Sequence, residues 1–476
     1  MRRLALVAAL LLAACTAVPA PDSTSAAPSP SAAAEIANGH FDGARAKAHV
    51  SYLADPARGG RMSGSAGYAD AAQYVADRFR EIGLEPLGDN GTYFQHFPMP
   101  NVELAAMPTL AAIAPSARTY KARVDMTETV GGRSGSGRAE STLAVVGGAA
   151  RAGVQNDFAG VDARGKIALV TGPTQGGSVV EAAYAEGATG VLLVGNTQIR
   201  YSYIPRLESA TIPVLVVNET VANELIAPSG KTVAAVRDAV RARRSDPSAP
   251  PTGFEVPTTL RMEVSLTPVR QIDAMNVVGL LRGADNTSEQ AVLVGGHLDA
   301  VGTDPDGSVF QGANDNASGP AVVMEVARAL AARRATLKRS IVFAAFAGEE
   351  EGFFGSEAYI ARTATSPGRV ESLTAMIDLD VIGCCGDSLF VSNEAPELQR
   401  RIRDTASRLG VSSTSSGAGG SDQTSFARRR VPAALIGWTD FILHTYRDTP
   451  DVVTVAKLKA AGDVVTDVAA QLASEG

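Results

Sequence analysis

The feature that most constrains the fold is an alternation of short apolar segments with longer helical ones from residue 256 onward. The strand candidates are Met275–Leu281, Gln290–Gly296, Ser340–Phe346, Ala375–Val381, Ser388–Ser392 and Val431–Trp438. Apolar periodicity favours helices at Gly319–Arg333, Glu394–Leu409 and Thr454–Leu472. Strands that are apolar almost throughout are buried on both faces, which requires helices on both sides of the sheet. The pattern therefore predicts an α/β fold with a mostly parallel, doubly wound sheet.

The part of the chain before residue 256 contains two regions with different sequence patterns. Helical periodicity occurs in Ala44–Leu53 and Tyr68–Ile82. Later residues instead form short Val, Ala and Leu strands between glycine-rich turns, and the segment Arg243–Pro251 has the composition of a linker. We therefore predict a first part of one domain at 37–105, an inserted α+β domain at 106–255, and the main part of the first domain at 256–476.

The N-terminus has the features of an export signal. Arg2 and Arg3 precede the apolar run Leu4–Ala14, which is too short to span a bilayer as a stable helix. The run ends in Leu-Ala-Ala-Cys15, which resembles a bacterial lipobox, and residues 16–36 have the composition of a disordered tether. We expect a lipoprotein signal peptide at 1–15 and an exported bacterial lipoprotein, anchored in a membrane through Cys15 and located in the periplasm or at the cell surface. The alternative is an ordinary secretory peptide in which Cys15 is incidental.

Charge and cysteine content narrow the functions further. A net charge of -7 argues against nucleic acid as a partner, because phosphate binding needs clustered Lys and Arg. Of the three cysteines, two are the adjacent Cys384 and Cys385, so the chain does not depend on a disulfide framework. We expect this pair to be two buried thiols, with a vicinal disulfide as the alternative.

Polar side chains that can bind metals interrupt the apolar pattern at the carboxyl ends of the predicted strands. They are His297 and Asp299, Glu349 to Glu351, and Asp378 and Asp380, with Asp315 in a glycine-bounded loop before a helix and His444 and Asp448 later in the chain. In open α/β sheets, ligands bind beyond the carboxyl ends of the strands. The sequence therefore predicts that these side chains meet in one site.

So many carboxylates in one place would repel one another unless a cation lay between them. Imidazole and carboxylate ligands without a thiolate suit zinc, with cobalt or manganese as lesser candidates. Two such ions about 3.5 to 4 Å apart can share one carboxylate and one water molecule, which acidifies the water and polarises a carbonyl group. The residues thus favour a pair of divalent metals.

Five sequence blocks, in this order, resemble those of the co-catalytic di-zinc aminopeptidase family, which includes glutamate carboxypeptidase, plasma glutamate carboxypeptidase and glutaminyl cyclase. The blocks are Gly-Gly-His-Leu-Asp, Gly-Ala-Asn-Asp-Asn-Ala-Ser-Gly, Gly-Glu-Glu-Glu-Gly-Phe-Phe-Gly-Ser, Leu-Asp-Val-Ile-Gly and His-Thr-Tyr-Arg-Asp-Thr. The resemblance covers 273–455 closely and 45–97 loosely. The insert at 106–255 resembles the protease-associated domain, for which it implies a role as a shield or lid over a cleft.

The resemblance implies a role for each site residue. His297 and Asp380 would hold one zinc ion, Glu350 and His444 the other, and Asp315 would bridge them. Glu349 would be the general base, and Asp299 would orient His297. For Asp378, Asp448 and Glu351, a capping or surface role and a functional role both remain open.

The chain departs from the family pattern at two places. Ser421-Asp422-Gln423 stands where relatives often have Ser-Asp-His, and Asp378 stands where Asn is common. Neither position is one of the expected metal ligands, so the departures bear on substrate preference.

The function that the resemblance implies is peptide hydrolysis with two zinc ions, in the fold of the zinc exopeptidases. Peptides would be the substrates, and removal of N-terminal residues is the first expectation because a free α-amino group can bind one metal directly. Carboxypeptidase or dipeptidase action is the alternative within the same fold, and glutaminyl cyclase activity fits a five-ligand site less well. A receptor-like relative without catalysis is the alternative from another class, and the intact ligand set disfavours it.

The export interpretation can be tested at Cys15. We expect Cys15→Ala to release the protein from the membrane fraction or to leave its signal uncleaved, because the lipid would be attached to that sulfur. Cell fractionation followed by mass spectrometry of the N-terminus measures both effects, with Thr24→Ala in the predicted tether as the control. Unchanged processing and membrane attachment in Cys15→Ala would refute lipidation at this residue.

Overall fold

The computed structural model describes residues 39–149, 156–172, 177–201, 203–204, 206–246, 248–285, 288–361, 367–417 and 420–475. The predicted signal peptide and tether lie outside these residues. No helix within the described ranges is long and apolar enough to cross a membrane.

The first of two large sheets has nine strands, in the order β1-β13-β15-β14-β16-β19-β17-β18 with β2 paired to β13. Its strands are β1 (Glu85–Pro86), β2 (Phe94–Asn101), β13 (Arg270–Leu281), β14 (Ala291–His297), β15 (Ser340–Phe346), β16 (Leu373–Leu379), β17 (Leu389–Ser392), β18 (Ser413–Ser416) and β19 (Ala433–Trp438). The four central strands β15, β14, β16 and β19 are parallel, and β17 pairs in parallel with β18. The antiparallel strands β13 and β17 flank this centre. The predicted α/β class is confirmed. The sheet is parallel at its centre but mixed overall, because β1, β2, β13 and β17 add antiparallel pairings.

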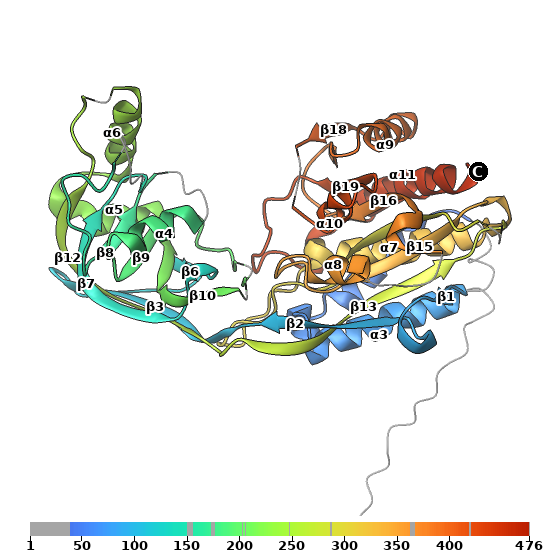
Figure 1. Ribbon diagram of the computed structural model, residues 1–476, viewed down its shortest axis with the longest axis horizontal. Helices are drawn as coiled ribbons and strands as arrows, with labels where there is room; N and C mark the ends of the chain where they lie inside the picture. Colours follow the sequence, from blue (N-terminus) through green and yellow to red (C-terminus); the bar gives the residue numbers. More distant parts are fainter. Residues whose placement is uncertain are drawn as a thin grey trace, which may run out of the picture. The chain divides into compact units, whose positions relative to one another are not determined.

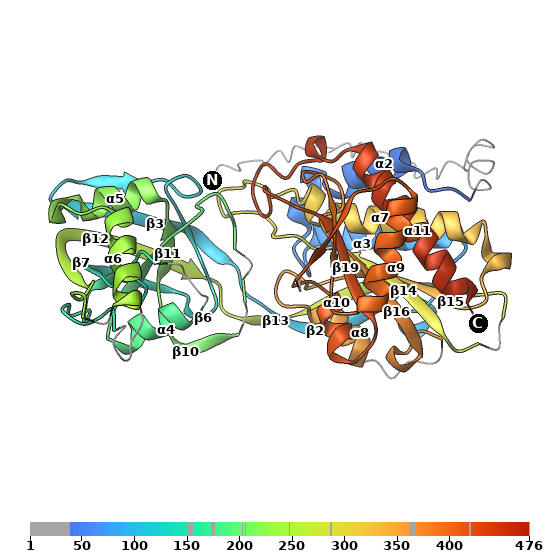
Figure 2. The same cartoon turned by 90° about the horizontal axis from the view of Figure 1, so that it is seen from above.

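Helices cover both faces of this sheet, as its apolar strands require. One face carries α2 (Gly43–Leu53), α3 (Ala66–Ile82), α7 (Ser318–Ala331), α9 (Pro396–Arg408) and α11 (Val455–Ser474), and the other carries α8 (Phe354–Ala361) and α10 (Gln423–Arg428). Helices α2, α7 and α11 contact one another, and Figure 2 shows them near one another. Along β14, Val292 and Val294 belong to the hydrophobic core under α2, α3, α7, α9 and α11. Ala291 and Leu293 belong to the core on the other face of the sheet, under α8 and α10. Every residue of β14 is therefore buried.

The second sheet has eight strands in the order β4-β3-β12-β7-β8-β9-β11-β5, accompanied by the pair β10-β6 (Figure 1). Its strands are β3 (Leu104–Ala114), β4 (Arg118–Tyr120), β5 (Met126–Glu128), β7 (Gly137–Val145), β8 (Ile167–Val170), β9 (Gly190–Val194), β11 (Val214–Val217) and β12 (Phe254–Leu266); the pair consists of β6 (Gly132–Ser134) and β10 (Leu207–Ile212). The helices of this part are α4 (Gly177–Ala185), α5 (Glu219–Ile226) and α6 (Val233–Ser245). We call residues 104–266 the inserted lobe and the rest of the described chain the main lobe. The boundaries predicted at 106 and 255 both fall inside strands, β3 and β12.

The remaining elements are short helical turns: η1 (Pro56–Arg61), η2 (Asp89–Gly91), η4 (Ala227–Ser229), η5 (Ala313–Ala317), η6 (Arg334–Thr336), η7 (Val370–Ser372) and η8 (Pro450–Val452). Two of them, η1 and η5, lie next to the predicted site.

Two details differ from the sequence prediction. No strand was predicted near residue 94, but β2 is a full strand that pairs antiparallel with β13 from Phe94 to Asn101. Pro98 and Pro100 concealed it, since proline is uncommon inside strands. In addition, Cys384 and Cys385 form a vicinal disulfide, so the expectation of two thiols was wrong. Their sulfurs lie on adjacent residues, and residue order alone does not show whether the local turn brings them within bonding distance.

Candidate metal centre

The predicted site residues follow neighbouring strands at the same edge of the main sheet. His297 is the last residue of β14 and stands in register with Phe346, the last residue of β15. Glu349 and Glu350 lie in the turn after β15, and Asp380 directly follows β16. Because parallel strands end at the same edge, these side chains converge.

Asp315 occupies the middle of the cluster. It lies in η5, the turn that leads into α7, and it is buried. One carboxylate oxygen lies 3.4 Å from Nε2 of His297, and the other lies 3.0 Å from Nε2 of His444. Asp315 thus joins two imidazoles that are far apart in the sequence.

The other two carboxylates lie one on each side of Asp315. Asp380 Oδ1 is 3.3 Å from Nε2 of His297, and Glu350 Oε2 is 2.9 Å from Nε2 of His444. Among the described residues, His297, Asp315 and Glu350 offer ligand atoms within 4.8 Å of one another, and so do His297, Glu349 and Asp380. The structure therefore brings together all five residues predicted as ligands.

Glu349 and Asp299 also reach this cluster, by different routes. Glu349 Oε2 lies 3.9 Å from Nε2 of His297, farther than the carboxylates of Asp315 and Asp380. On the other side of the ring, Nδ1 of His297 lies 3.2 Å from the backbone carbonyl oxygen of Asp299 and 3.7 Å from its carboxylate. That carboxylate accepts a hydrogen bond from the backbone N–H of Glu350. Asp299 therefore meets His297 mainly through its main chain.

The electrostatics of the cluster are those of a cation site. Burial alone would lower the pKa of His297, but Glu349 and Asp380 raise it well above its usual value. Burial likewise opposes protonation of His444, and Glu350 and Asp315 raise its pKa. Burial raises the pKa of Glu349 well above the usual value, and the neighbouring carboxylates of Glu350 and Asp380 add to the rise. Imidazole nitrogens and carboxylate oxygens directed at one space fit divalent metal ions, which would relieve this repulsion.

Asp448 holds the loop that carries Asp315. Its carboxylate accepts hydrogen bonds from the backbone N–H groups of Asn314 and Asp315, at 2.7 and 2.9 Å. Asn316 on the other side donates its side-chain N–H to the carbonyl of Leu379, the last residue of β16. Both contacts attach the Asp315 loop to segments that carry other site residues, so Asp448 is a positioning residue.

Arg61 is a supporting residue that the sequence analysis missed. Its guanidinium is fully buried and donates hydrogen bonds of 2.8 to 2.9 Å to the backbone carbonyls of Leu53, Leu298, Gln311 and Gly312. Burial lowers its pKa to about 10. Leu298 follows His297, and Gly312 begins the turn that contains Asp315, so one side chain holds two ligand loops.

Ser63, two residues after Arg61, contacts a third segment of the site, the turn that carries Glu349. Ser63 Oγ accepts a hydrogen bond of 2.8 Å from the backbone N–H of Gly348, next to Glu349. The signal available in the sequence was that Arg61 is the one charged residue of Gly59–Ser65, a segment rich in glycine and serine.

The two departures from the family pattern, Asp378 and Ser421-Asp422-Gln423, contact each other in the fold. Asp378 and Asp422 are both buried, and the backbone N–H of Gln423 donates to the Asp378 carboxylate at 2.8 Å. Burial raises the pKa of Asp422 to about 7. Neither carboxylate is among the ligand groups of the described cluster.

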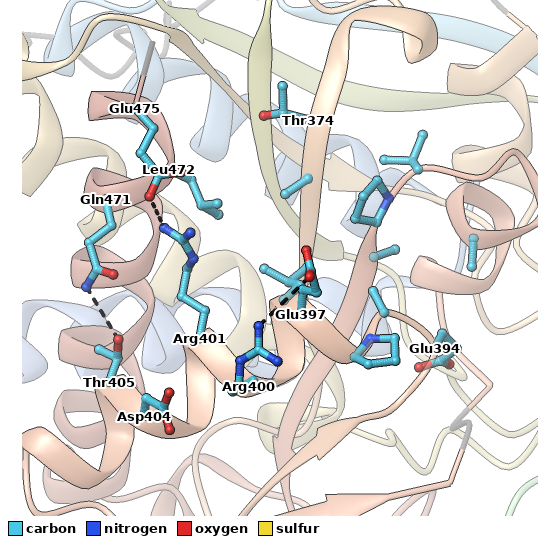
Figure 3. A pocket seen from close by; sticks show the side chains of 18 of the residues that line it. Thr374, Glu394, Glu397, Arg400, Arg401, Asp404, Thr405, Gln471, Leu472 and Glu475 are labelled. Atoms are coloured by element: carbon cyan, nitrogen blue, oxygen red, sulfur yellow. Dashed lines mark hydrogen bonds and ion pairs between the residues drawn. The ribbon is translucent and has the colours of Figure 1, made fainter.

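A cavity of about 850 Å³ lies elsewhere (Figure 3). It is lined by α9, the last turn of α11 and the beginnings of β16 and β19, including Thr374. Arg401 of α9 pairs with Glu475 after α11, and Arg400 pairs with Glu397 along α9. Since Thr374 is the second residue of β16 and Asp380 follows the end of that strand, this cavity is at the opposite edge of the sheet from the cluster around Asp315.

The fold and the cluster together define an α/β protein with a buried metal-type site at the carboxyl ends of its parallel strands. The structure superposes on an aminopeptidase from Aneurinibacillus sp. strain AM-1 with a TM-score of 0.68 at 21% identity, over 93% of this chain and 96% of that one. It superposes on a zinc aminopeptidase from Bacillus subtilis with a TM-score of 0.64 at 21% identity, over 91% and 95% of the two chains. These likenesses establish the fold.

Residues 276–469 match the model of peptidase family M28, and residues 140–225 match that of the PA domain. These two matches agree with the predicted resemblance of the main lobe to the di-zinc aminopeptidase family and of the insert to the protease-associated domain.

Sequence relatives agree with this assignment. Aminopeptidase YwaD of Bacillus subtilis is 26% identical over 66% of this chain and 64% of its own length. A probable leucine aminopeptidase of Trichophyton verrucosum is 31% identical over 36% of this chain and 48% of its own length. The matches thus span between about half and two thirds of these relatives.

The role of Arg61 can be tested by replacing it with lysine. Lysine keeps the charge but cannot present the planar fork that reaches four carbonyls. We expect Arg61→Lys to lower the free energy of unfolding by about 3 kcal/mol, because buried carbonyls lose their donors. Urea unfolding measures this change. Arg80→Lys on the exposed face of α3 is the control, and equal unfolding midpoints in the two variants would contradict the assigned role.

Proposed function

We propose that this chain is an aminopeptidase that uses two zinc ions to hydrolyse the N-terminal peptide bond of peptides. The observation that carries the proposal is the position of Asp315, with one carboxylate oxygen facing His297 and the other facing His444. A carboxylate placed in this way can bind two cations at once, as paired-metal sites require. The imidazole and carboxylate donors favour zinc.

In this proposal the cluster divides into two halves. His297 and Asp380 would hold one zinc ion, Glu350 and His444 would hold the other, and Asp315 would be shared. The distances in the structure support this division, because Asp380 approaches His297 and Glu350 approaches His444. When bound, the two ions would supply Lewis acidity for the scissile carbonyl and would acidify a water molecule.

Glu349 is the proposed general base. It would accept the proton of the attacking water and return it to the nitrogen of the leaving amine, which is the usual exchange for a carboxylate base. Its distance from His297 supports this role, since at 3.9 Å its carboxylate stands back from the ring more than the proposed ligands do. The carbonyl of Asp299 would keep Nε2 of His297 directed toward the metal by accepting from Nδ1.

The choice of the amino end rests on chemistry and on the names of the relatives. A free α-amino group can bind one of the two ions directly, which would select the end of a peptide. The Bacillus subtilis and Trichophyton verrucosum relatives are both named aminopeptidases. Carboxypeptidase or dipeptidase action is the second candidate and uses the same residues.

We also propose that the enzyme works outside the cytoplasm on exported or environmental peptides, tethered by a lipid on Cys15. The support is the sequence before the described residues, with Arg2 and Arg3, the apolar run Leu4–Ala14, and the small residues before Cys15.

The adjacent Glu349 and Glu350 should fail in different ways when changed. We expect Glu350→Gln to lose one of two zinc ions together with activity, because a direct ligand is weakened. Glu349→Gln should keep two zinc ions and lose about two to four orders of magnitude in kcat, the usual effect of removing a general base. Elemental analysis and steady-state kinetics in one buffer measure both. If Glu349→Gln stays active and Glu350→Gln keeps its metal, the two roles are exchanged.

Substrate-end selection can be tested with matched peptides. We expect the zinc-loaded protein to release the first residue from a free peptide and to leave its N-acetylated counterpart intact, because the acetyl group removes the metal-binding amine. Mass spectrometry of the products identifies the bond cleaved. Release of C-terminal residues from the blocked peptide would instead assign carboxypeptidase action, and cleavage confined to dipeptides would assign a dipeptidase. No cleavage by the folded, metal-loaded protein would favour the receptor-like alternative.

A further inference from the structure

A buried ion network joins the inserted lobe to the loop that follows His297. Arg123, next to β5 in the inserted lobe, donates two hydrogen bonds of 2.8 Å to the two carboxylate oxygens of Asp304 in the main lobe. Its guanidinium also pairs with Glu128 at 2.8 Å. The side chains of Arg123, Glu128 and Asp304 are between 0 and 4% exposed, so water does not screen these contacts.

The same carboxylate reaches the segment that carries His444. The hydroxyl of Tyr446, two residues after His444, donates to Asp304 at 2.6 Å. The ring of Tyr446 stacks on the ring of Phe310 with centroids 4.1 Å apart. The guanidinium of Arg123 lies 5.6 Å from the centre of the Phe310 ring. Asp304 therefore connects Arg123 of the inserted lobe to the His444 segment.

Arg200 of the inserted lobe makes a second and more direct contact. Its backbone N–H donates to the backbone carbonyl of His444 at 2.9 Å. Its guanidinium is 2% exposed and lies 3.7 Å from the Asp304 carboxylate. The His444 segment is thus held at two points, at the carbonyl of His444 and at the hydroxyl of Tyr446.

His444 needs such support because of its backbone conformation. Its φ is +54°, in the left-handed region that residues other than glycine rarely adopt. Conformations of this kind persist where the surroundings hold them. The neighbouring Phe441 and Leu443 are 75% and 40% exposed, so they contribute little packing.

We propose that the inserted lobe positions a metal ligand: Arg123, acting through Asp304 and Tyr446, and Arg200, acting through its backbone, hold His444 against Asp315 and Glu350. The proposal rests on the proposed function, in which His444 binds the second zinc ion. It gives the inserted lobe a task beyond shielding a cleft, because one half of the metal centre depends on it and the other half does not. Arg123, Asp304, Tyr446 and Arg200 are positioning residues, since none of them contacts a proposed metal position.

The test compares zinc affinities of folded full-length variants by titration against a competing chelator. His444→Ala first identifies the binding step that belongs to the Glu350 half. We expect Tyr446→Phe, which removes one hydroxyl, to weaken that step by about tenfold, the lower end of the effect of losing an outer partner of a metal ligand. Asp304→Asn should weaken the same step at least as much. The other step, assigned to His297 and Asp380, should keep its affinity.

Tyr120→Phe is the matched control. Tyr120 also lies in the inserted lobe and donates its hydroxyl to a carboxylate, that of Glu224, at 3.1 Å. It takes no part in the contacts described above for the His444 segment, so both zinc affinities should stay at the parent value. Thermal unfolding shows that each variant is folded, and Tyr446→Phe keeps the test decisive if Asp304→Asn fails to fold.

Three results would overturn the proposal. The first is a Tyr446→Phe variant with both zinc affinities unchanged, and the second is a variant in which both steps weaken equally, which would indicate general destabilisation. The third is a Tyr120→Phe control that weakens the same step as Tyr446→Phe. A parent protein that binds only one zinc ion is a different failure, since it contradicts the proposed function itself.

Discussion

The crowding of buried carboxylates around Asp315 is the constraint on which the rest of the structure depends. Asp315, Glu350 and Asp380 each lie within about 3.5 Å of one of two imidazole nitrogens, so the carboxylates crowd one another, and crowded like charges are costly without a cation. The fold holds these side chains in fixed positions at the carboxyl ends of its parallel strands. Bound divalent metal ions would relieve the repulsion between them.

Rigid positions require support from outside the cluster, and most of it comes through backbone groups. Arg61 binds carbonyls beside two ligand loops, and Asp448 binds the N–H groups of Asn314 and Asp315. In each case a buried charge meets main-chain dipoles, so a loop is held without a second side chain that could compete for the metals. Arg123 and Asp304 extend this principle to the inserted lobe. Their pairing is a physical link between the inserted lobe and the loop that follows His297.

The ligand residues could be found in the sequence because they break a strong pattern. His297 and Asp380 follow strands that are otherwise apolar, and Asp315 precedes a long helix in a glycine-bounded loop. The supporting residues break no such pattern. Arg61 lies more than two hundred residues from the carbonyls of Leu298 and Gly312. Asp304 is one acidic residue in a polar loop until folding places Arg123 beside it.

The sequence by itself determined the α/β class, the central strands and the long helices of the main lobe, and the residue types of the cluster around Asp315. These follow from local periodicity and from the short separation between each strand and the polar residues at its end. Only the tertiary structure decided that β2 pairs with β13, that Cys384 and Cys385 are bonded, and that Asp315 lies between the two imidazoles. Such contacts join residues that are close in the folded structure, and local sequence patterns do not show which distant residues come close.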